Sequence, residues 1–155
     1  HAVHRYLEHY KANPVGHTVV FPNVIDTLGK LKEDGFRMGV CTNKPYEITL
    51  LVLEGLGMNV FFNGVTGGDS LTFNKPDPRH ILVTLDLIKS DPSRAVMVGD
   101  SRIDAEAGRN AGLPVIAVAY GYRSEPVESL GADVVIDDFG QLPQAITQLC
   151  PVQEG

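Results

Sequence analysis

Short apolar runs alternate with amphipathic stretches along this chain, and this alternation constrains its fold more than any other feature. The runs at 36–41, 95–99, 114–118 and 133–136 are largely apolar rather than apolar at every second residue. Strands of this kind are buried on both faces, which is typical of parallel sheets covered by helices. The sequence therefore predicts an α/β fold with helices on both faces of a parallel sheet.

Helical spacing of apolar residues predicts the elements between these runs. The expected helices cover 2–12, a stretch from Pro22 to Gly35, 45–56, 77–89, 102–111 and 139–149. Their core-facing residues include Val24, Leu28 and Leu31 in the second helix and Ile48, Val52 and Leu56 in the third. Asp77 and Pro78 form a good cap and first turn for the fourth helix. A weaker apolar piece at 60–65 is expected as an edge strand.

Composition and charge restrict the classes of function. The 155 residues carry a net charge of −6, which disfavours non-specific binding to nucleic acid and to an anionic membrane surface. No run approaches the roughly 18 apolar residues of a membrane span. Cys41 lies in an apolar stretch and is expected to be a buried free thiol in a cytoplasmic protein. The histidines lack the paired spacing of a zinc site.

Polar residues follow the expected strands, at the edge where parallel sheets bind ligands. Thr42 and Asn43 come directly after the run at 36–41 and could bind an anion together with the N–H groups of the next helix. Alternatively, one of them only caps that helix. Lys75 precedes a proline, which fixes its backbone and suits a point charge for phosphate. The alternative is a solvated loop lysine.

Two carboxylates, Asp100 and Asp104, follow the run at 95–99. Acids this close repel one another unless a cation lies between or beside them. A small set of hard oxygen ligands fits Mg²⁺, which keeps several waters and takes other ligands from a substrate phosphate. In the alternative, Asp100 or Ser101 caps the following helix and Asp104 complements its dipole. Taken together, the groups favour a site for phosphoryl chemistry.

These motifs and their order resemble the haloacid dehalogenase-like phosphohydrolase superfamily. The segments VCTNKP (40–45), NKPDP (74–78) and VGDSRIDAEAGRNAG (98–112) are similar to its second, third and fourth motifs. The resemblance covers about residues 18–145 and is greatest to the phosphoglycolate phosphatase branch. It implies a Rossmann-like core at 18–150, a tail at 151–155, and a remnant of the family's helical cap and linker at 1–17.

The resemblance also implies roles for individual residues. Thr42 and Asn43 would bind the phosphoryl oxygens, and Lys75 would neutralise their charge as a catalytic residue. Asp100 would ligate Mg²⁺, and Asp104 would ligate or orient it. The substrate would be a small phosphorylated metabolite.

The family's first motif, a strand that ends in Asp-x-Asp-Gly-Thr, is absent from this sequence. That motif carries the nucleophilic aspartate and the acid–base aspartate, and its strand lies centrally in the sheet. Asp137 follows an apolar run but has Phe139 two positions later, where the motif needs an acid. We therefore expect the motif to precede His1 in a longer protein. An open slot in the sheet is also expected, and a homodimer that fills it is a hypothesis.

The leading prediction is a Mg²⁺-dependent phosphatase that converts 2-phosphoglycolate to glycolate and phosphate through a phospho-aspartyl intermediate. This chain by itself is expected to be inactive. One alternative is a sugar-phosphate phosphatase or phosphomutase of the same superfamily. Another is a non-catalytic module that binds phosphate or Mg²⁺. A receiver domain is disfavoured because the threonine and lysine precede the acid pair.

Overall fold

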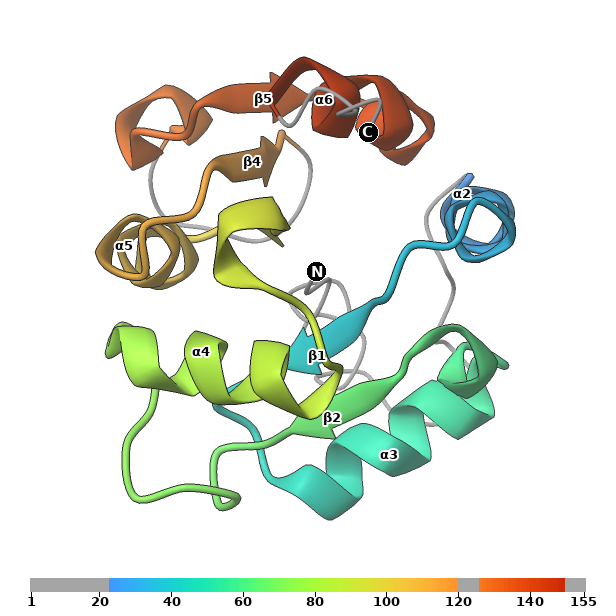
Figure 1. Ribbon diagram of the computed structural model, residues 1–155, viewed down its shortest axis with the longest axis vertical. Helices are drawn as coiled ribbons and strands as arrows, with labels where there is room; N and C mark the ends of the chain where they lie inside the picture. The colour runs from blue at the N-terminus through green and yellow to red at the C-terminus, as the bar shows by residue number, and fades with distance from the viewer. Residues whose placement is uncertain (1–22, 120–125, 150–155) are drawn as a thin grey trace.

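The computed structural model describes residues 23–119 and 126–149, so the predicted helix at 2–12 lies outside the described part. Helices and parallel strands alternate along it (Figure 1). The α-helices are α2 (Val24–Glu33), α3 (Tyr46–Gly55), α4 (Pro78–Leu87), α5 (Arg102–Asn110) and α6 (Leu142–Leu149). The strands are β1 (Gly39–Cys41), β2 (Gly64–Thr66), β3 (Met97–Gly99), β4 (Val115–Val118) and β5 (Val134–Ile136). Short 3-10 helices are η1 (Asn59–Phe61), η2 (Pro92–Arg94), η3 (Val127–Leu130) and η4 (Phe139–Gln141).

The strands form two parallel sheets rather than one. β1 pairs with β2, and β3, β4 and β5 pair in that order. Within 23–119 and 126–149, no strand pairing joins β1 to β3. The break agrees with the expectation of an α/β sheet that lacks a central strand. The carboxyl ends of β1 and β3 lie on either side of this break, at the same edge of the strands.

Helices cover both faces of the strands, as the sequence predicts. Alternate strand residues point to opposite faces, and the core therefore divides into two clusters. Val40 and Val98 pack with the apolar residues of α2, α3 and α6. Cys41 and Met97 pack on the other face with α4, α5 and η3. Figure 1 shows this separation, with α4 and α5 away from α2 and α6.

Cys41 is a free, buried thiol, as predicted. Burial raises the pKa of this thiol to about 12, although hydrogen bonds from Thr84 and Thr66 act in the opposite direction. A thiol that stays protonated is a poor nucleophile, so Cys41 is a core residue. No helix within the described ranges is both long and apolar enough to cross a membrane.

Two local predictions are wrong. The piece at 60–65 is not a single strand, because residues 59–61 form η1 and the strand begins only at Gly64. Ile48 does not face the core and is 48% exposed. α3 instead buries Thr49 and Leu53. Its residues are apolar on nearly every side, so helical spacing alone could not select the buried face.

Candidate active site

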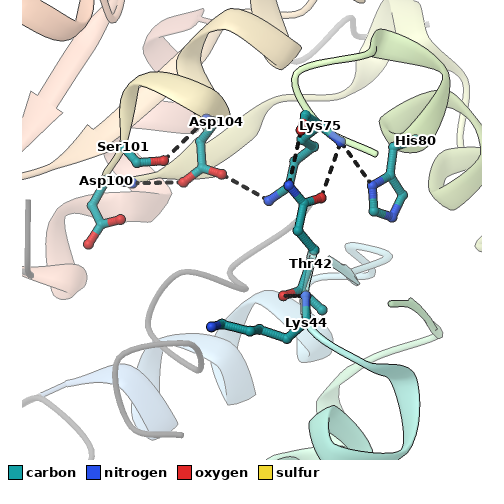
Figure 2. Close-up of polar contacts among 8 residues, drawn as sticks. Thr42, Lys44, Lys75, His80, Asp100, Ser101 and Asp104 are labelled. Atoms are coloured by element: carbon teal, nitrogen blue, oxygen red, sulfur yellow. Dashed lines mark hydrogen bonds and ion pairs between the residues drawn. The ribbon is translucent and has the colours of Figure 1, made fainter. Parts of the chain in front are cut away.

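The predicted site residues converge at the carboxyl ends of β1 and β3 (Figure 2). Thr42 follows β1 and Asp100 follows β3, and both are buried. Lys75 arrives from the loop before α4, and its side chain extends toward the first turn of α5. The parallel arrangement of the strands therefore brings together residues that are far apart in the sequence.

A buried ion pair lies at the centre of this site. Lys75 Nζ donates to Asp104 Oδ1 at 2.9 Å, and each side chain is only 2% exposed. The interpretation of Lys75 as a solvated loop lysine is therefore wrong. Burial lowers the pKa of Lys75, while Asp104 and Asp100 act to raise it. A charged pair at this depth is costly to desolvate, and each partner depends strongly on the other.

The second oxygen of Asp104 is also in use. Asp104 Oδ2 accepts the backbone N–H of Asp100 at 3.3 Å. Ser101 caps α5, since its Oγ accepts the N–H of Asp104 at 3.3 Å. The capping alternative is thus correct for Ser101, yet it does not account for the carboxylate of Asp104. That carboxylate links β3 to the lysine loop.

Gly99 gives Asp104 the space it occupies. A Cβ added to Gly99 would lie 2.6 Å from the Cβ of Asp104 and 2.7 Å from its Cγ. Real side-chain carbons do not approach so closely, so a larger residue would displace the carboxyl group. The glycine before Asp100 is therefore part of the geometry of the site.

Asn43 holds the main chain of Lys75. Its Nδ2 donates to the carbonyl of Lys75 at 3.0 Å, and its Oδ1 accepts the N–H of Lys75 at 3.2 Å. Both ends of the amide are thus engaged with one peptide segment. The predicted contact of Asn43 with a phosphate remains a prediction, and its side chain has a positioning role in addition.

Two hydrogen bonds hold the loop between β1 and α3. Thr42 Oγ1 accepts the backbone N–H of Lys44 at 3.1 Å. Neither Thr42 nor Asn43 caps α3. Instead Asp69, from the loop after β2, accepts the N–H of Tyr46 at 2.8 Å. A cap from a distant loop leaves no local sequence signal, so the sequence could not identify Asp69.

Sequence reasoning also missed His80, which belongs to the first turn of α4. Its side chain is fully buried, and its Nδ1 accepts the backbone N–H of Lys75 at 3.3 Å (Figure 2). Burial and the charge of Lys75 lower the pKa of His80 to about 4, against smaller effects of the Thr66 backbone and Asp77. The sequence offered one signal for a role of His80 near Lys75: His80 lies five residues after Lys75, in the first turn of the helix that Asp77 caps.

The sequence profile of the family described as haloacid dehalogenase-like hydrolase matches residues 1–118. This chain belongs to that family.

Curated relatives and solved structures agree with this membership. The chain is 43% identical to a phosphoglycolate phosphatase of Agrobacterium fabrum over 92% of its own length and 61% of that protein. It superposes with a TM-score of 0.81 on a structure described as a predicted phosphoglycolate phosphatase from Haemophilus somnus, at 31% identity. That alignment covers 88% of this chain and 61% of the other. The chain thus spans about three fifths of the length of these haloacid dehalogenase-like relatives.

A third similar structure contains a ligand. CbbY from Rhodobacter sphaeroides, solved with xylulose-1,5-bisphosphate, is 26% identical and superposes with a TM-score of 0.72. The alignment covers 85% of this chain and 59% of CbbY. CbbY, which is similar in structure to this chain, therefore binds a sugar phosphate ester.

The donor chemistry at the site fits the Mg²⁺ that the family implies. Asp100 and Asp104 supply carboxylate oxygens at one strand end, and both are buried. Within the described part of the chain, no three histidine, cysteine or acidic side chains lie close enough to form a metal cluster. Two hard oxygen donors suit a cation that keeps waters and shares a phosphate. They do not suit a structural zinc ion, which needs four nitrogen or sulfur ligands.

Proposed function

We propose that the longer protein of which this chain is part is a phosphatase of the phosphoglycolate type. It would hydrolyse 2-phosphoglycolate to glycolate and inorganic phosphate. The observation that carries the proposal is the buried pair of Lys75 and Asp104 beside Asp100, where two parallel sheets end. The similarity to the Agrobacterium fabrum phosphatase supports the choice of substrate.

Each residue of this edge has a role in the proposal. Lys75 presents a buried positive charge that stabilises the negative charge of the phosphoryl group. Thr42 and the backbone after β1 donate hydrogen bonds to phosphoryl oxygens. Asn43 would support them, because its amide already holds the peptide of Lys75. Such groups act most strongly where water is excluded.

Asp100 is the proposed ligand of Mg²⁺, and Asp104 is proposed to ligate or orient it. The contacts of Asp104 favour the second role, since both of its oxygens already accept hydrogen bonds. When bound, the ion supplies positive charge next to the transferred phosphate. Asp104 would also keep Lys75 protonated, because a carboxylate at 2.9 Å favours the charged ammonium.

The nucleophile is proposed to come from the Asp-x-Asp-Gly-Thr motif, which this sequence does not contain. In that step an aspartate oxygen bonds to phosphorus and the bond to the substrate oxygen breaks. The second acid protonates the leaving alkoxide, and water then releases phosphate from the phospho-aspartate. We accordingly propose that this chain alone has no phosphatase activity.

A chimera tests the proposal. This chain is joined to the part of the Agrobacterium fabrum protein that it does not match, and release of inorganic phosphate from 2-phosphoglycolate is measured with Mg²⁺. We expect activity in the chimera, none in this chain alone, and loss of activity in the chimera with Asp100→Asn. A folded but inactive chimera would contradict the proposal, as would turnover by this chain alone.

The chimera is also assayed with two sugar phosphates, xylulose-1,5-bisphosphate and a hexose phosphate. The sugar-phosphate alternative is favoured by one observation, the ligand of the similar CbbY structure. A higher kcat/KM for a sugar phosphate than for 2-phosphoglycolate would replace the leading proposal by this alternative.

A further inference from the structure

We propose that His80 is a positioning residue for Lys75. Its imidazole, held in one neutral tautomer, accepts the backbone N–H of Lys75 and so fixes the lysine that reaches Asp104. The effect on catalysis rests on the proposed phosphatase function, whereas the tautomer and the fixed backbone do not.

The hydrogen bond determines the tautomer. His80 Nδ1 lies 3.3 Å from the backbone nitrogen of Lys75, which can only donate. Nδ1 must therefore carry no proton, and in the neutral ring the proton sits on Nε2. Protonation of both nitrogens would place a donor against a donor, next to a lysine that is itself charged.

The other side of the ring gives an independent indication. Nε2 is buried and, among the residues described by the structure, it is the only buried side-chain nitrogen or oxygen that makes no hydrogen bond of good geometry. The backbone of Thr66 is its nearest acceptor and acts to raise the pKa of the ring. A buried polar atom without a partner is costly, and an apolar side chain of similar size would avoid that cost. What the imidazole provides here is the acceptor at Nδ1. The contact with Lys75 is thus the better-formed hydrogen bond of the ring.

The charges around the ring keep it neutral. Lys75 and burial disfavour the imidazolium, while Asp77 and the backbone of Thr66 oppose them with smaller effect. The pKa of about 4 keeps the acceptor available at neutral pH.

The result is a lysine held by its main chain from two elements. The N–H of Lys75 is shared between Asn43 Oδ1 at 3.2 Å and His80 Nδ1 at 3.3 Å. Its carbonyl accepts Nδ2 of Asn43. A long flexible side chain reaches a fixed point only if its backbone is fixed. The contacts of His80 and Asn43 therefore fix the backbone from which the ammonium group reaches Asp104.

The first test uses this chain alone and needs no activity. Nitrogen-15 NMR of the His80 ring is expected to show the Nε2–H tautomer, unchanged between pH 8 and pH 5. Exchange of the Lys75 amide proton with solvent is expected to be slow in the wild type and in His80→Asn, which keeps an acceptor near Nδ1. It is expected to be faster in His80→Leu. A proton on Nδ1, or titration near the ordinary histidine pKa, would overturn the proposal.

The second test places three variants in the active chimera. His80→Leu removes the acceptor, His80→Asn keeps it, and His80→Gln keeps the polarity but moves the acceptor to the Nε2 side. We expect kcat to fall about tenfold to a hundredfold in the Leu and Gln variants, which is the usual cost of a misplaced catalytic group, and to recover largely in the Asn variant. KM should change less than kcat.

The outcomes separate the two proposals. Equal loss in all three variants would mean that His80 acts only through packing, and no loss in any of them would also overturn the proposal. If His80→Leu does not fold, the comparison of Asn with Gln decides. If the wild-type chimera is inactive, the phosphatase proposal fails while the tautomer and amide exchange still test the role of His80.

Discussion

Both edges of the parallel strands carry charged side chains, but these are exposed at one edge and buried at the other. At the amino-terminal ends of β1 and β3, a cavity of about 460 Å³ is lined by Arg37, Lys89, Arg94, Asp34 and Asp91 among others. All five of these charged residues are exposed. At the carboxyl-terminal ends, Lys75, Asp100 and Asp104 are buried, and two of them form a 2.9 Å ion pair.

We propose that the edge with buried, mutually dependent charges, rather than the edge with the cavity, is the functional one. Exposed charges are well solvated, so their pairing contributes little. Buried charges are costly and survive only with good partners, which is typical of sites that need a preorganised field. Substitutions at the two edges should therefore differ in their effect on stability.

The largest effect is expected when the ion pair is broken. Lys75→Met leaves Asp104 buried without its partner and should lower the free energy of unfolding by about 3–5 kcal/mol. Arg94→Met, at the exposed edge, should change it by less than about 0.5 kcal/mol. Chemical denaturation of both variants measures the difference.

A double variant sharpens this test. Adding Asp104→Asn to Lys75→Met removes the unpaired charge and keeps an acceptor for Asp100, so much of the stability should return. Equal losses in Lys75→Met and Arg94→Met would refute the contrast between the edges.

A pH-dependent effect is expected from His80. Below pH 6.5 the unfolded chain takes up a proton on this histidine, while the folded chain resists it until about pH 4. Proton uptake stabilises the unfolded state relative to the folded state. The free energy of unfolding therefore decreases as the pH falls through this window, by up to about 3 kcal/mol. Urea unfolding between pH 7 and pH 4.5 should show a steeper loss in the wild type than in His80→Asn. Parallel curves for the two proteins would refute the burial of a neutral ring.

A smaller effect is expected at Gly99. Gly99→Ala places a methyl group against Asp104 and should cost about 2 kcal/mol, within the range for overpacking. Gly55→Ala is the matched control, because a Cβ at that position meets nothing within 4 Å. Thermal unfolding should separate the two variants, and similar melting temperatures would mean that Asp104 moves aside easily.

The smallest effect is expected at the cap of α3. Asp69→Ala removes the acceptor for the N–H of Tyr46 and should cost about 1 kcal/mol. Asp69→Asn keeps an acceptor oxygen and should recover most of this loss. Denaturant midpoints measure both, and an Asp69→Ala variant as stable as the wild type would exclude the cap.

The sequence predicted most of the fold because each strand and helix has a local signal. The apolar runs at 95–99 and 114–118 contain β3 and β4, and Asp77 caps α4 as expected. The errors arose where the local pattern was ambiguous. Ile48 lies in a helix that is apolar on most sides, and its exposure depends on neighbours that are distant in sequence.

The site was predicted in part for the same reason. Lys75 and Asp104 stand in recognisable motifs, but their direct pairing joins positions 29 residues apart. His80 and Asp69 act through the main chains of Lys75 and Tyr46, and any residue type except proline could occupy those donor positions. Unlike a local cap such as Asp77, these two contacts to backbone atoms leave no pattern in the sequence, so only the folded structure could identify them.

We propose that the edge formed by the carboxyl ends of β1 and β3 binds phosphate and Mg²⁺. Inorganic phosphate and Mg²⁺ are titrated into the nitrogen-15-labelled chain while amide chemical shifts are recorded. We expect saturable shifts at Thr42, Asn43, Lys75 and Asp100 that require Mg²⁺ and are lost in Asp100→Asn. Shifts confined to the other edge, at Arg37 and Lys89, or no saturable shifts at all, would contradict it.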